Sequence, residues 1–346
     1  MRVSLVAMAI VLAAGVQARG EGLDAGQVSA DAKWLIHLDF SAASDSKVVQ
    51  HLHEKRLSQG KAKERLEKLS EKIGMDPIKD LISITLYDTR FVPHQGVAIV
   101  RARNLDKERL LALLKKKEPD HKVQQHGGHQ LYTWVRKKGK RSGHQVTGCF
   151  HGDKTVVFGR DVHQVKAALD VLDGRSGKLA SDSPLAAKAA AGTILLVRAS
   201  GIAGADTPFK SEVVRRSERL SLAAGEHDGK AFIDGQLVAE TAQVANQLRT
   251  IVKGFRALAQ LRHGNEEEFK PILKGLSVTS SQQTVSIKLQ VQLEDLKKVA
   301  DKLRQHKKQW KKGKHRHHKG GKGHRDKGRH GRHKHHEHQQ KEKQPD

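Results

Sequence analysis

The stretch VTGCFHGDKTVVFGRDVHQVKAALDVLDG, residues 146–174, contains one complete structural unit and predicts the fold of the whole chain. Two runs rich in β-branched and aromatic residues flank a Gly-Asp turn, as in a β-hairpin. Asp161 then stands where a helix N-cap is expected, and Gly174 stands where the helix should end. The apolar face of that helix consists of Val162, Val165, Leu169 and Leu172. The stretch therefore predicts strand, turn, strand and helix.

Three further copies of this unit follow the same hydrophobic period, at residues 81–114, 220–258 and 285–303. In the copy at 220–258 the apolar face of the helix consists of Val244, Leu248, Ile251, Phe255 and Leu258. Strands of period two bury one face of a sheet, and a following amphipathic helix can cover that face. The sequence thus predicts an α+β fold, an antiparallel sheet with helices on one face.

Two additional strands indicate a larger duplication. They are KWLIHLDF at residues 33–40 and TILLVRAS at residues 193–200, and each opens a half that contains two of the hairpin-helix units. We therefore predict two similar α+β domains, at residues 31–175 and 192–305, joined by a small-residue linker at 176–191. The first domain carries an extra hairpin at residues 129–146.

The amino-terminal residues have the pattern of an export signal. Met1 and Arg2 give a positive start, residues 3–15 are apolar or small, and residues 16–18 form a small-x-small cleavage site. We predict a signal peptide at 1–18, a short linker at 19–30, and a periplasmic or secreted protein without a transmembrane segment. Cys149 is the only cysteine, so no internal disulfide forms, and we interpret it as a small buried hydrophobe.

The charge of the chain is strongly positive and is densest at the carboxyl end. The whole sequence carries 64 Lys or Arg against 38 acids, a formal charge of +26. Residues 306–346 contain 15 Lys or Arg, 10 His and 4 acids, and no apolar residue follows Trp310. Because nothing there can be buried to offset the entropy of ordering, we predict a disordered basic tail.

A flexible polycation attracts anionic polymers, and its hold weakens as salt rises. The expected partners are polysaccharide, envelope phosphate or extracellular nucleic acid, bound by tail residues that include Lys311, Lys312 and Lys314. A second basic segment follows Tyr132 and Trp134 on the extra hairpin, an arrangement of cations beside aromatics that suits a charged polymer. Its cations are Arg136, Lys137, Lys138, Lys140 and Arg141.

The histidines suggest a different ligand, a divalent metal such as Ni, Cu or Zn, although no cofactor is required. The candidate tail ligands are His315, His317, His318, His333, His335, His336 and His338. In the folded part, His126 and His129 flank two glycines in a turn, and neighbouring segments carry His121, His144 and His151. For these folded-part histidines we favour chance adjacency, because the chain contains 22 His, Gly-Gly is a good hairpin turn, and the spacing matches no ligand pattern of structural zinc.

No catalytic residue is assigned. The sequence lacks a nucleophile elbow, a phosphate-binding loop, a zincin motif and a cysteine pair. His37 and Asp39 alternate with apolar residues of one strand, and we interpret them as hydrogen-bonded polar residues on the surface of the sheet.

The segments DAKWLIHLDF, HGGHQLYTWV, CFHGDKTVVFGRDVHQVKAALDVLDG and RALAQL together resemble a family of exported bacterial proteins of uncharacterised function, over about residues 30–300. The resemblance implies export and an α+β architecture, and it brings no catalytic residues. Three hypotheses follow: a noncatalytic binding or envelope-associated protein with a polyanion-binding tail, a metal-sequestering protein, and an enzyme with a site in a cleft between the two halves.

Overall fold

The computed structural model describes residues 22–56, 60–93, 95–136, 143–206 and 212–302. The predicted signal peptide at 1–18 and the predicted tail at 306–346 lie outside them. The strands are β1 (Trp34–Asp39), β2 (Leu81–Asp88), β3 (Val97–Ala102), β4 (Lys122–His126), β5 (His129–Val135), β6 (Gln145–His151), β7 (Thr155–Gly159), β8 (Thr193–Ser200), β9 (Ser217–His227), β10 (Lys230–Ala239), β11 (Leu276–Ser281) and β12 (Thr284–Gln292).

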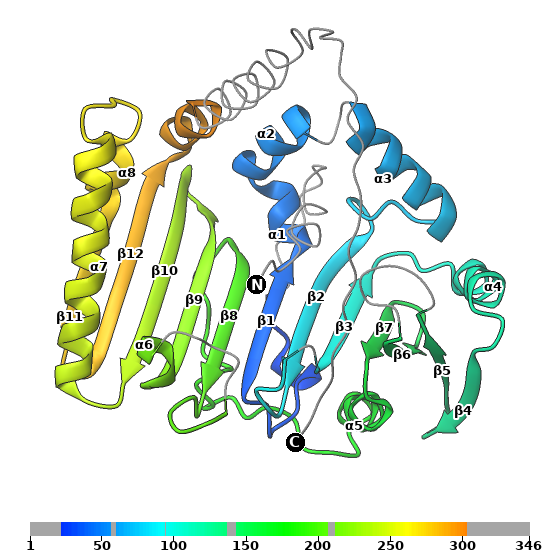
Figure 1. Cartoon of the computed structure of the whole chain (residues 1–346). Helices are drawn as coiled ribbons and strands as arrows, with labels where there is room; N and C mark the ends of the chain where they lie inside the picture. Colours follow the sequence, from blue (N-terminus) through cyan, green and yellow to red (C-terminus); the bar gives the residue numbers. More distant parts are fainter. Residues whose placement is uncertain (1–21, 57–59, 94, 137–142, 207–211, 303–346) are drawn as a thin grey trace, which may run out of the picture. The chain divides into compact units, whose positions relative to one another are not determined.

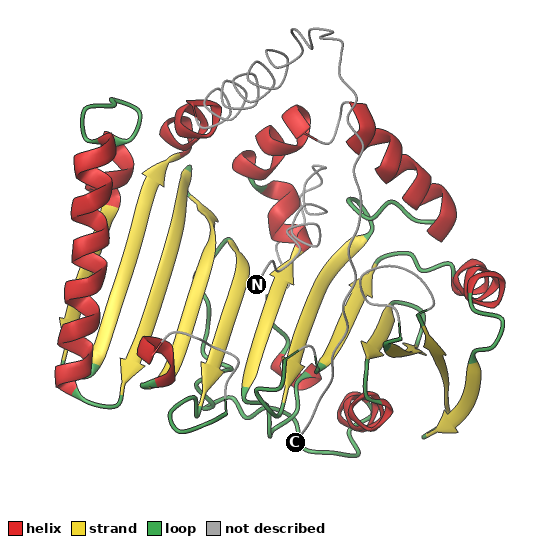
Figure 2. Ribbon diagram, in the orientation of Figure 1, coloured by secondary structure: helices red, strands yellow, loops and turns green. Residues whose placement is uncertain are grey.

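The helices stand before, between and after these strands in the chain (Figure 2). They are the short 3-10 helix η1 (Ala25–Gln27), α1 (Phe40–Asp45), α2 (Lys47–Arg56), α3 (Gly60–Ile73), α4 (Lys107–Lys117), α5 (Val162–Leu172), α6 (Glu212–Arg215), α7 (Ala242–His263) and α8 (Lys270–Gly275). Residues 293–302 are also helical. All pairings between named strands are antiparallel, so the predicted α+β class is confirmed.

The described strands form one 12-stranded sheet, in the order β11-β12-β10-β9-β8-β1-β2-β3-β7-β6-β5-β4 (Figure 1). Outward from β1 the order is β1-β2-β3-β7-β6, and outward from β8 it is β8-β9-β10-β12-β11, the same connectivity twice. The β4–β5 hairpin is the addition to the first half. The halves join because β1 pairs with β8 as well as with β2: Trp34 lies opposite both Ala199 and Asp88.

Helices of the first half lie on both faces of the sheet, which differs from the expected one-sided arrangement. Val157 of β7 belongs to the core that α5 covers, whereas its neighbour Phe158 lines an apolar pocket of about 290 Å³ beside α4. Adjacent residues of a strand point to opposite faces, so α4 and α5 are on opposite faces. Apolar residues on both faces of β5, β6 and β7 explain the difference.

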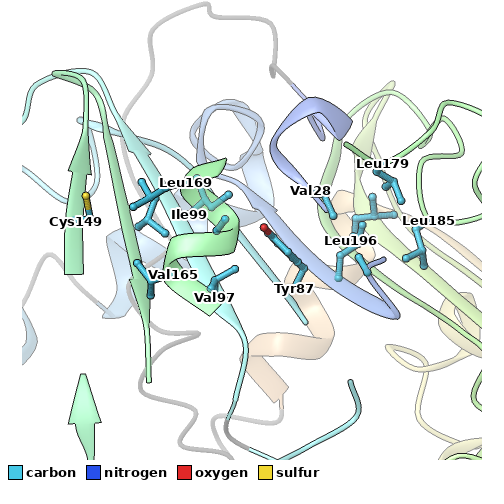
Figure 3. Close-up of a cluster of buried hydrophobic side chains, with 14 of the residues drawn as sticks. Val28, Tyr87, Val97, Ile99, Cys149, Val165, Leu169, Leu179, Leu185 and Leu196 are labelled. Atoms are coloured by element: carbon cyan, nitrogen blue, oxygen red, sulfur yellow. The ribbon is translucent and has the colours of Figure 1, made fainter. Parts of the chain in front are cut away.

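The main core lies between α5 and the sheet. Figure 3 shows Val165 and Leu169 of α5 beside Val97 and Ile99 of β3. Cys149 of β6 is 1% exposed in the same cluster, and burial raises the pKa of its thiol to about 11. A thiol so difficult to ionise is a poor nucleophile at neutral pH, as expected of a buried hydrophobe. The predicted start of α5 is confirmed, since the Asp161 side chain accepts from the His163 backbone N–H.

Candidate functional site

A cluster of histidines and aspartates lies where the β4–β5 hairpin and the end of β6 meet the carboxyl end of α5. His126 pairs with His129 across a turn whose two glycines, Gly127 and Gly128, have φ of 56° and 86°. Such positive φ values suit glycine and let the hairpin close tightly. His151 is the last residue of β6, and its ring centroid lies 5.2 Å from that of His129.

Two aspartates of the α5 segment hold these three rings. His129 and His151 donate from Nε2 to the two carboxylate oxygens of Asp173, each at 3.0 Å. His126 donates from Nε2 to Asp170 Oδ1 at 2.9 Å. We call the set formed by these residues and Arg175 the His–Asp cluster; its members are His126, His129, His151, Asp170, Asp173 and Arg175.

Arg175 links the two halves of the His–Asp cluster. Its guanidinium lies 2.8 Å from Asp170 Oδ1 and 2.6 Å from Asp173 Oδ2. Burial alone would raise the pKa of Asp173, but hydrogen bonds from His129 and His151 and the charge of Arg175 lower it overall. The pKa of Asp170 is also lowered, because the hydrogen bonds from Arg175 and His126 outweigh burial. Both carboxylates are therefore ionised at neutral pH.

These lowered pKa values predict a pH dependence of stability. The folded chain stabilises the ionised form of Asp173, so the pKa of this carboxyl group is lower in the folded chain than in the unfolded chain. In the unfolded chain an aspartate has a pKa of about 3.9. The stabilising contribution of Asp173 is therefore present above about pH 4 and is lost as pH falls through the folded pKa. We expect Asp173→Asn to flatten the acid limb of the unfolding free energy, measured by urea titration from about pH 5 to pH 2. An unchanged limb would contradict the ion pairing.

The geometry also suits a divalent metal. His129, His151 and Asp173 each offer one ligand atom, and the three atoms lie within 4.8 Å of one another. Two imidazole nitrogens and a carboxylate oxygen form a donor set that zinc and other divalent transition metals accept, with water completing the coordination. Asp170 and Arg175 border the site. Without a metal, the His–Asp cluster is a network of hydrogen bonds and ion pairs. A divalent cation could bind there if it replaced the protons on Nε2 of His129 and His151.

The remaining sequence candidates lie elsewhere. His121 contacts the Glu118 carbonyl oxygen at 2.8 Å and the ring of Tyr132, and His144 lines a shallow pocket with Arg160 and Asp161. The structure thus brings together three of the five candidate histidines named in the folded part, His126, His129 and His151. Arg136 is exposed at the end of β5, whereas residues 137–142 and every candidate in the tail lie outside the described residues.

His37 and Asp39 are not surface residues, which corrects the sequence interpretation. Each is only 3% exposed, because residues 22–28 and 179–192 cover that face of the sheet. His37 Nδ1 lies 2.9 Å from Thr85 Oγ1, and burial lowers the pKa of its ring despite the charge of Asp39. Asp39 caps α1 by accepting from the Ala42 N–H.

Both residues line a pocket of about 540 Å³ at the seam between β1 and β8. The carboxylate of Glu226 in its wall accepts from Ser46 Oγ at 2.7 Å and from the Val48 N–H at 3.1 Å. Asp39 accepts from the Gly22 N–H at 3.1 Å in addition to capping α1. These two carboxylates hold the start of α1 and the start of α2 in place, and Ser46 Oγ also accepts from the Val49 N–H at 3.2 Å.

Comparison with known proteins gives a distant likeness only. No family model and no curated protein matches the chain. Crystal form III of TP0453 superimposes with a TM-score of 0.46 at 8% identity, covering 80% of this chain and 96% of that one. Crystal form IV gives a TM-score of 0.41 at 8% identity, covering 80% and 95%. At TM-scores below 0.5 and 8% identity, this likeness supports no conclusion about the function of the chain.

Proposed function

We propose that this protein is an exported, noncatalytic binding or envelope-associated protein whose basic tail holds anionic polymers or surfaces. The observation that carries the proposal is the charge of residues 306–346, where 15 Lys or Arg against 4 acids give +11 before any histidine is protonated. An unfolded polycation binds polysaccharide, phosphate or nucleic acid through its charge alone. None of the described helices is both long and apolar enough to cross a membrane.

Deletion of residues 307–346 tests this function. We expect the shortened protein to elute from a sulfated polysaccharide column at clearly lower salt than the full chain, because counterion release scales with the number of cations engaged. A second variant tests the basic segment at residues 136–141 separately. In it, glutamine replaces Arg136, Lys137, Lys138, Lys140 and Arg141. If the deletion variant elutes at the same salt concentration as the full chain, the tail does not bind the anionic polymer and the proposed function is wrong.

Metal binding is the second candidate, favoured by the convergence of His129, His151 and Asp173. We propose that Ni²⁺, Cu²⁺ or Zn²⁺ binds at the His–Asp cluster and at the tail histidines. Calorimetric titration at about pH 7.5 should show fewer metal equivalents after deletion of residues 307–346, with one site remaining in the folded part. The two candidates respond oppositely to acid: at about pH 5 protonation of the tail histidines should strengthen anion binding by the tail and weaken metal binding by it.

A further inference from the structure

The apolar face of α7 is buried over only part of its length. Val244 and Leu248 are each 4% exposed and pack with Leu237, Val278 and Val285 of the sheet. Further along the helix, the apolar side chains are Ile251, Phe255, Leu258 and Leu261, which are 46%, 67%, 62% and 85% exposed. We call these four residues the α7 stripe.

The sequence predicts Ile251, Phe255 and Leu258 on the same face as the buried Val244 and Leu248, because they continue the helical spacing. Geometry explains why they are not covered. A helix of 22 residues is about 33 Å long, whereas the 6-residue edge strand β11 spans about 20 Å. Since β11 is the last strand of the sheet, no further strand lies beyond it to cover the side of α7 that faces away from β12 (Figure 1).

The charge of α7 indicates what would cover the stripe. Residues 242–263 contain four cations, Arg249, Lys253, Arg256 and Arg262, and no Asp or Glu. Large apolar side chains beside a basic, acid-free polar face are typical of helices that lie in the headgroup region of a bilayer. Three acids follow at residues 266–268, and two of them are engaged locally: Glu266 accepts from His263 at 2.8 Å and Glu267 pairs with Lys270.

We propose that the α7 stripe binds the surface of an anionic phospholipid membrane. The stripe lies at the boundary of headgroups and acyl chains, while the cations of α7 meet lipid phosphates. Burial of apolar side chains and attraction to anionic headgroups act together in this mode of binding. The α7 stripe shares no residue with the predicted tail, so it would give the protein a second contact with an acidic surface that does not depend on the charge of the tail.

Flotation of the full chain with vesicles tests the proposal. The vesicles contain either phosphatidylcholine alone or phosphatidylcholine with about one third phosphatidylglycerol. We expect Phe255→Ser combined with Leu258→Ser to lower partitioning onto the anionic vesicles at least about tenfold, because two large side chains leave the bilayer. Binding of the unmodified chain to neutral vesicles should be several-fold weaker than to anionic ones.

The matched control is Val123→Ser combined with Val135→Ser, since those valines are 53% and 50% exposed on β4 and β5. The control should bind as the unmodified chain does. Because every variant keeps the tail, a difference between them reports α7 alone, and failure of the tail hypothesis would leave this comparison unaffected. Equal partitioning of the α7 variant and the unmodified chain would overturn the proposal. So would a lipid-independent dimer by light scattering that Phe255→Ser and Leu258→Ser dissociate, because the stripe would then bind a second copy.

Discussion

Changing His129 and His151 together to alanine is expected to weaken Zn²⁺ binding by the folded part at least about 100-fold, because it removes two of the three protein ligands. The measurement is calorimetric titration of the chain without residues 307–346, so that tail histidines do not contribute. Arg175→Ala should have the opposite effect and raise affinity several-fold. Its guanidinium lies 2.6 Å from Asp173 Oδ2 and competes with a cation for that carboxylate.

The matched control is His121→Ala combined with His163→Ala, which also removes two imidazoles but leaves the His–Asp cluster intact. Its affinity should equal that of the parent chain. If the cluster serves only to fix the hairpin to α5, the parent gives no heat with Zn²⁺. In that case the double variant His129→Ala and His151→Ala lowers the unfolding free energy without changing Zn²⁺ binding. Arg175→Ala then does not raise the affinity for Zn²⁺.

Much of the fold could be predicted because its signals are local. The Gly-Asp turn of β6–β7, the cap at Asp161 and the repeated hairpin-helix units depend on residues close in sequence, and each is present in the structure. The pairing of β1 with β8 joins residues about 160 positions apart. The hydrophobic period of a strand is the same at the edge of a sheet as at its centre, so periodicity could not reveal that the two halves share one sheet.

The candidate site shows the same limit. His126, His129 and His151 were visible as histidines in or near turns, but their partners Asp170 and Asp173 resembled ordinary polar positions at the end of a helix. One signal was present: the two carboxylates are spaced i, i+3 and so share a helix face, in a segment directly after the His151 hairpin. The hydrophobic period of α7 also predicted that Ile251, Phe255 and Leu258 are buried, whereas they are exposed. A helical period does not show where the sheet beneath the helix ends.

Leu169→Ala should destabilise the folded chain strongly. The side chain is fully buried at 0% exposure, and it packs in one cluster with Ile99, Leu131 and Val157. Removing a buried leucine side chain in such a setting costs about 2 to 5 kcal/mol, the lost burial plus the cavity left behind. The measurement is the unfolding free energy from urea denaturation.

The same substitution tests whether the core positions the site. Asp170 follows Leu169 directly in α5, and Asp173 caps the helix one turn later, so their carboxylates are placed by the packing of this helix. We therefore expect Leu169→Ala to weaken Zn²⁺ binding as well, although residue 169 contributes no ligand. His163→Ala, on the exposed side of α5, should change stability by less than about 0.5 kcal/mol. A loss below about 1 kcal/mol for Leu169→Ala would contradict the docking of α5 on the sheet, because removal of a fully buried leucine side chain costs more than that.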